Sequence, residues 1–191
     1  MVTAAPHAAG VSWRLWNFLT LIEFLHLYRL QMCVMGCAAG APPLKEAALA
    51  SVFVVSTGDL SRAKVGGVDD PTVAWAGAFA TCGGHGATQS STIVYEIEPG
   101  RRLGWHTDAT EETQYILAGA GELRMEDGSS HQVGPGSVFV LPTPVRHDLV
   151  NTGQETLRAV AFFAAPMFTQ TFDNAMLPPN VHVLGTPNRD G

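Results

Sequence analysis

One short segment of this chain, residues 100–119, constrains its fold more than any other feature of the sequence. It holds three side chains that can bind a metal ion, His106, Asp108 and Glu112, within seven residues. On an extended strand, side chains two positions apart leave the same face, which places His106 and Asp108 together. A turn over 109–111 would bring Glu112 into the following strand, beside the first two. The segment therefore predicts two adjacent strands that share a cluster of polar side chains.

A second segment, residues 136–151, adds His147 at the start of another short strand. Two imidazoles and two carboxylates form a suitable ligand set for a divalent first-row metal. Glu111 is an alternative to Glu112, but on an extended chain it points to the opposite face, so Glu112 is preferred. A second arrangement leaves Asp108 unbound, with two histidines and one carboxylate as the metal-binding face.

The two segments resemble the paired motifs of the cupin superfamily. The first motif is Gly, five residues, His-x-His, three or four residues, Glu, six residues and Gly, and the second is Gly, five residues, Pro-x-Gly, two residues, His, three residues and Asn. The residues that match are Gly100, His106, Glu112 and Gly119 in the first motif, and Gly136, Pro142, His147 and Asn151 in the second. Two identities differ, because Asp108 replaces the second His of the first motif and Pro144 replaces the inner Gly of the second.

This resemblance implies an all-β fold, the jelly-roll β-barrel of a single-domain, germin-like cupin. It also implies a metal held by His106, Glu112 and His147, with Asp108 as the fourth ligand. With two carboxylates instead of one, the charge of a divalent metal site falls to about zero, which favours Fe²⁺ or Mn²⁺ and also admits Zn²⁺, Co²⁺ or Ni²⁺. Cupins often pair through the edges of their sheets, so the resemblance further implies a homodimer.

The function expected from the resemblance is that of a metal-dependent enzyme acting on a small organic molecule. A non-haem oxidoreductase of the dioxygenase type, or a related lyase, is preferred, because no unattached Lys, His or Tyr stands out as a general base. Gln114, two residues beyond Glu112 on the same strand face, is the candidate catalytic residue that orients the substrate. The alternative is a non-catalytic cupin that binds or senses a small-molecule ligand. Against a metal-free site, two carboxylates buried together would repel each other unless a cation or protons neutralised them.

The remaining sequence from residue 46 onward is typical of an antiparallel β-structure. Residues 91–100 alternate apolar and polar side chains, 121–133 contain an Asp-Gly turn, and 137–166 supply three further short strands. No strand–helix–strand rhythm interrupts them, so 46–166 is predicted to form the barrel. The last segment, 167–191, carries three prolines and is predicted to be a mostly irregular tail.

Residues 1–45 are predicted to be an extension, helical or disordered. Residues 13–30 are rich in large apolar side chains, but polar residues recur every third position and spiral around a helix, so no clean apolar face results. Charges interrupt the run, so a membrane span is not expected. Two alternatives stay open: export as a lipoprotein through Cys37, and a natural start downstream near Met32 or Met35.

Composition narrows the possible partners. The chain has 191 residues with 11 basic and 17 acidic side chains, a net charge of −6, and no cluster of Lys or Arg. This balance argues against nucleic acid as a partner. A small-molecule substrate is what the resemblance to cupins implies. The three cysteines are an odd number without the spacing of a disulfide framework, which predicts a reducing compartment, the cytoplasm.

Overall fold

The computed structural model describes residues 52–186, so the predictions for residues 1–45 lie outside the described residues. This part of the chain is all-β, with twelve strands and one short 3₁₀ turn, Gly83–His85. The strands are β1 (Ala63–Gly67), β2 (Ala74–Thr81), β3 (Ser91–Ile97), β4 (His106–Asp108), β5 (Glu112–Ala118), β6 (Gly121–Met125), β7 (Ser130–Val133), β8 (Val138–Leu141), β9 (His147–Asn151), β10 (Leu157–Phe163), β11 (Thr169–Leu177) and β12 (Val181–Gly185). Within residues 52–186 we find no helix with the length and apolar character needed to cross a bilayer.

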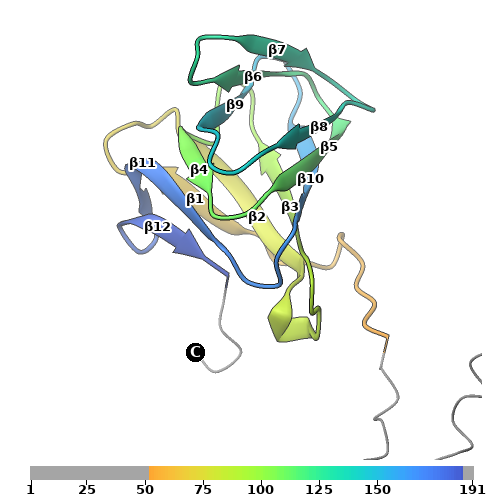
Figure 1. Ribbon diagram of the computed structural model, residues 1–191. Coiled ribbons are helices and arrows are strands. Elements are labelled where there is room, and N and C mark those ends of the chain that lie inside the picture. The colour runs from red at the N-terminus through yellow and green to blue at the C-terminus, as the bar shows by residue number, and fades with distance from the viewer. Residues whose placement is uncertain (1–51, 187–191) are drawn as a thin grey trace, which may run out of the picture. The chain divides into compact units, whose positions relative to one another are not determined.

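The strands form one antiparallel sheet in the order β7-β6-β9-β4-β11-β1-β2-β3-β10-β5-β8, with β12 paired to β11. The sheet curls on itself, so that the strands near its two ends, β6 and β9 on one side and β5 and β8 on the other, face each other (Figure 1). Their inward side chains meet in one hydrophobic cluster, which contains Leu123 of β6, Leu149 of β9, Ile116 of β5 and Leu141 of β8. The prediction of an all-β barrel is therefore confirmed.

Alternation along the strands determines which side chains reach the interior. In β10 every second residue is buried, from Leu157 to Phe163, and the residues between them are partly or fully exposed. In β5 the same alternation buries Glu112, Gln114 and Ile116. Two polar side chains thus share the inner face of β5 with an apolar one, and they do so at the end of the strand nearest β4.

The prediction of a mostly irregular tail after residue 166 was wrong for residues 169–185. β11 lies inside the sheet, between β4 and β1, and β12 pairs with it. The physical reason is burial: Phe172 and Met176 of β11 are almost completely enclosed, and they pack with Val73 in a second small cluster. Three prolines were the reason for predicting an irregular tail, but two of them, Pro178 and Pro179, lie in the connection between β11 and β12, where no ladder hydrogen bond is lost.

Candidate metal centre

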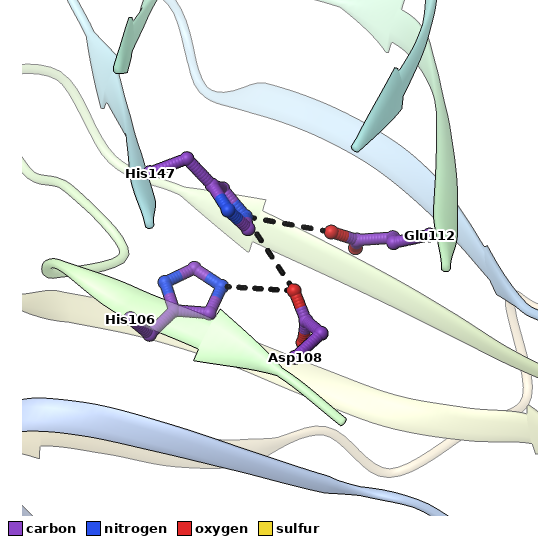
Figure 2. A group of neighbouring side chains, drawn as sticks. All are labelled: His106, Asp108, Glu112 and His147. Atoms are coloured by element: carbon purple, nitrogen blue, oxygen red, sulfur yellow. Dashed lines mark ion pairs between the residues drawn. The ribbon is translucent and has the colours of Figure 1, made fainter. Parts of the chain in front are cut away.

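Three strands bring the four motif side chains to one place. His106 and Asp108 lie at the two ends of β4, Glu112 begins β5, and His147 begins β9. β4 and β9 are adjacent, and His106 and His147 are direct partners across them. All four side chains are buried. Figure 2 shows them pointing toward one another. Glu111, the alternative to Glu112, is exposed, as the parity argument predicts.

The distances between the four side chains suit a single ion. One potential ligand atom from each residue lies within 4.8 Å of all the others. His147 Nε2 is 3.5 Å from Glu112 Oε2 and 3.7 Å from Asp108 Oδ2, and His106 Nε2 is 4.0 Å from the same Asp108 oxygen. Four ligands about 2.1 Å from a tetrahedral ion would lie about 3.4 Å apart, so small movements would complete the coordination.

Hydrogen bonding leaves the atoms that face the centre without partners. Asp108 Oδ2, Glu112 Oε2 and His147 Nε2 are buried and have no hydrogen-bond partner among the described residues. A buried polar atom without a partner costs roughly 1–3 kcal/mol, more for a charged group. Three such atoms from three strands, all facing one point, are the arrangement that a bound cation would satisfy.

Both imidazole rings are oriented by backbone contacts at the opposite nitrogen. Nδ1 of His106 lies 2.7 Å from the carbonyl oxygen of Gly104, and Nδ1 of His147 lies 3.0 Å from that of Val145. A neutral ring that donates from Nδ1 presents the lone pair of Nε2 to the centre, as metal-binding histidines do. The ring of Phe172 stacks on His106 with centroids 4.7 Å apart, which restricts that imidazole further.

The electrostatics of the cluster also favour a cation. Burial, followed by the charge of Glu112, raises the pKa of Asp108 to about 7. Burial, followed by the charge of His147, lowers the pKa of His106 to about 3. Burial also opposes protonation of His147, but Glu112 and Asp108 outweigh it and raise the pKa of that ring. Raised pKa values at Asp108 and His147 mean that the metal-free cluster favours positive charge or protons where a cation would bind.

Two further polar side chains belong to this interior, and the sequence analysis missed both. Gln170 of β11 lies directly opposite Asp108 on the adjacent strand β4, and its Nε2 donates a hydrogen bond to Asp108 Oδ1 at 2.9 Å. Tyr95 of β3 donates its hydroxyl to Gln114 Oε1 at 2.5 Å. Burial, followed by the charges of Glu112 and Asp108, raises the pKa of Tyr95 well above its usual range, so its hydroxyl keeps its proton. No motif marks these residues, because they come from strands outside both motif segments.

Gln114, the predicted substrate-orienting residue, is completely buried on the inner face of β5. Its oxygen is occupied by Tyr95, whereas its Nε2 has no partner among the described residues. Two histidines outside the motifs, His131 and His182, were predicted to be surface residues, and both are exposed.

A cavity of about 20 Å³ lies beside His106 and Glu112 and is also lined by Tyr95 and Gln170. This is room for about one water molecule or ion, not for an organic substrate. Asp108 and His147 do not line it, so this space borders the cluster on the side of His106 and Glu112.

Comparison with known proteins agrees with the fold and the motifs. A family model described as "Cupin domain" matches residues 93–163, which extend from β3 through β10 and contain all four clustered side chains. The chain carries a cupin domain. The resemblance of the two motif segments to the cupin superfamily is therefore confirmed.

Individual relatives of this cupin are distant or partial. Protein SchB of Streptomyces halstedii is 35% identical over 83 residues, which cover 43% of this chain and 59% of that protein. The polyketide cyclase RemF from Streptomyces resistomycificus is 20% identical with a TM-score of 0.51, covering 59% of this chain and 79% of RemF. A putative sugar phosphate isomerase from Acidithiobacillus ferrooxidans is 21% identical with a TM-score of 0.51, covering 71% of this chain and 87% of the other. The match thus spans less than two thirds of the curated relative, and the two structures show a shared fold.

Proposed function

We propose that this cupin is a metal-dependent enzyme that acts on a small organic molecule. His106, Asp108, Glu112 and His147 would hold a divalent metal ion. The observation that carries the proposal is the convergence of three buried ligand atoms without partners, from Asp108, Glu112 and His147. The donor set of two imidazoles and two carboxylates favours Fe²⁺ or Mn²⁺, with Zn²⁺, Co²⁺ and Ni²⁺ as acceptable substitutes.

The ion would supply Lewis-acid or oxygen-binding chemistry in an enclosed, poorly hydrated site. The chain's own contribution is positional: Gly104 and Val145 orient the two rings, and Gln170 orients the Asp108 carboxylate. Gln114 is our candidate for the residue that orients the substrate, because it lies two residues beyond Glu112 on the same inner face of β5. We infer an oxygenase of the dioxygenase type or a related lyase, since the described interior offers no separate general base.

Metal analysis tests the first part of the proposal. The protein is purified without chelator, its metal content is measured by mass spectrometry, and the metal-free form is titrated with Fe²⁺ under argon and with Mn²⁺. We expect close to one equivalent in the wild type and loss of tight binding in His147→Ala and Glu112→Gln. The exposed neighbour Glu111→Gln is the matched control and should bind as the wild type does. Less than about a tenth of an equivalent after reloading would refute a metal enzyme of this kind.

Activity separates this function from the alternative, a non-catalytic cupin that binds or senses a ligand. Oxygen uptake by the Fe²⁺-loaded protein, measured across a panel of small organic compounds, indicates an oxygenase. Product formation without oxygen uptake indicates a lyase. Tight reversible ligand binding without turnover, under every metal tested, would favour the sensor.

We also propose that the protein is a homodimer located in the cytoplasm. An exposed apolar face on three neighbouring strands, β10, β5 and β8, supports the dimer. Its members are Tyr115, Leu117, Val138, Val140 and Phe162, and the strand registers place them on one side of the sheet. Light scattering of the wild type and of Val138→Lys tests the dimer, which the lysine should weaken. Cell fractionation tests the location, and recovery in the membrane pellet would refute it.

A further inference from the structure

A second, much larger cavity lies next to the metal centre. It has a volume of about 640 Å³ and is lined by residues of β1, β2, β11 and β12, among others. Three of its lining residues, Trp75, Ile93 and Gln170, also line the small cavity beside His106 and Glu112. Because Gln170 also bonds Asp108, the two cavities meet at the edge of the proposed coordination sphere.

The lining of this large cavity has a distinct chemical character. Of the described residues around it, none is Lys, Arg, Asp or Glu. Aromatic and aliphatic side chains dominate, with Trp75, Phe79 and Phe168 as the largest. His85 is the one basic side chain among the described lining residues, so an anionic or cationic ligand would lose part of its hydration here and gain no counter-charge from Lys, Arg, Asp or Glu. The volume is typical of sites for organic ligands of moderate size.

One polar atom in this lining lacks a partner. The indole N–H of Trp75 is buried and makes no hydrogen bond to any described residue. Its ring sits over Gly77, where a Cβ atom would come within 2.8 Å of the indole, so the glycine leaves the space that the ring occupies. The indole nitrogen has almost no accessible surface, so a ligand in the cavity meets the ring of Trp75 and not its N–H.

We propose that the large cavity is the substrate site and that it selects an uncharged, largely apolar molecule. The shared wall at Gln170 places the ligand beside the metal. This assignment of substrate class rests on the proposed metal-dependent function.

The test compares 1-naphthol with 1-naphthoate, which present the same rings with a neutral and an anionic oxygen group. Binding is measured at pH 7 by calorimetry on the full chain after chelator treatment, because a metal ion could itself bind the carboxylate. We expect 1-naphthol to bind at least about tenfold more tightly than 1-naphthoate, since burying an unpaired charge is costly.

A pair of variants on β1 tests the location. Ala63 is paired with Gly77 and lines the cavity, so Ala63→Phe should fill it and abolish 1-naphthol binding. Lys64, the next residue of β1, is exposed, lies on the opposite face of the strand and does not line the cavity. Lys64→Phe is therefore the matched control and should bind 1-naphthol as the wild type does. No binding by the wild type, a preference for 1-naphthoate, or equal binding by both variants would overturn the proposal.

Metal content measured on the same samples keeps the two proposals distinguishable. A protein that binds 1-naphthol in this cavity but takes up no metal would retain the ligand site and refute the metal enzyme. If the protein takes up one metal ion but Ala63→Phe binds 1-naphthol as tightly as the wild type does, the metal site would be retained and the proposed ligand site refuted.

Discussion

The buried carboxylate of Asp148 accepts a hydrogen bond from the backbone N–H of Gly104, with 2.8 Å between nitrogen and oxygen. Its other oxygen accepts from Arg102 at 2.5 Å, and Arg102 also pairs with Asp70. Asp148 follows His147 on β9, and the carbonyl of Gly104 orients His106. Asp148 therefore joins the two strands that carry the histidines of the candidate metal centre.

The first prediction concerns this link. Asp148→Ala should lower the free energy of unfolding by about 3 kcal/mol, because Arg102 and the Gly104 N–H lose a buried partner. Urea denaturation of the metal-free protein measures the change. Glu122→Gln is the matched control, since it breaks a surface ion pair with Arg124 that solvent screens and that should contribute little to stability. Equal losses in the two variants would contradict a structural role for Asp148.

The second prediction concerns Gln170, which holds Asp108 by a hydrogen bond from outside the proposed ligand set. Gln170→Leu should weaken metal binding roughly 10- to 100-fold, as loss of a partner that orients a ligand usually does. Competition with a chelator of known affinity measures this. Gln132→Leu, on the exposed β7, removes the same amide far from the centre and should leave the affinity unchanged. Unaltered metal affinity in both variants would show that the hydrogen bond from Gln170 to Asp108 does not contribute to metal binding.

The sequence predicted the motif cluster because its members are either close neighbours along the chain or placed together by the resemblance to the cupin motifs. The parity of a strand places His106 with Asp108 and separates Glu112 from Glu111, and both relations hold in the structure. The position of His147 beside them depended on the resemblance to the cupin motifs. Asn151, the last residue of the second motif, proves to brace a turn: it donates to the carbonyls of Ile97 and Glu155 and accepts from Gly153.

The surroundings of the cluster could not be predicted in the same way, because they depend on pairing between distant strands. Gln170 reaches Asp108 only because β11 inserts between β4 and β1. Because this region was predicted to be irregular, no pairing with β4, and so no contact with Asp108, was expected. Trp75 and Tyr95 reach the interior from β2 and β3, where a single large side chain gives no indication of the cavity that it lines. Spacing along the chain therefore predicts ligands better than it predicts the shape of a substrate site.

The third prediction is a pH dependence of metal stabilisation. In the metal-free fold the pKa of Asp108 is raised to about 7 from 3.8. Between these values the folded state holds a proton that the unfolded chain has lost, so this group's contribution to stability decreases as pH rises through about 7. A metal ion replaces that proton, so its affinity should rise up to about tenfold per pH unit below pH 7. The metal-induced shift in melting temperature, at fixed Mn²⁺, should grow from pH 6 to pH 8.

A single substitution provides the control for this pH effect. Asp108→Asn removes the titrating carboxyl while keeping its size, so the growth of the shift between pH 6 and pH 8 should diminish. A shift that is flat in the wild type, or equally steep in Asp108→Asn, would contradict the assignment to Asp108.

The fourth prediction tests whether Asp108 acts as a ligand. Asp108→His restores the residue usual in the first cupin motif and replaces a carboxylate by a neutral imidazole. Metal preference should move from Mn²⁺ towards Ni²⁺ or Zn²⁺ without loss of binding, because nitrogen ligands favour these softer ions. Competitive loading with an equimolar mixture, followed by elemental analysis, measures the preference. An unchanged ratio would indicate that the side chain at 108 does not bind the ion.

The fifth prediction concerns the pair formed by Tyr95 and Gln114, both buried on inner faces of the barrel. Tyr95→Phe leaves the amide oxygen of Gln114 unpaired, and Gln114→Leu leaves the Tyr95 hydroxyl unpaired. Each should cost roughly 1–3 kcal/mol of unfolding free energy, whereas the double variant removes both polar groups and should cost less than the sum. Urea denaturation of the four proteins gives a coupling energy, expected to exceed about 1 kcal/mol. Strictly additive losses would mean that the short hydrogen bond contributes little, and that Gln114 is free to turn its amide towards a substrate.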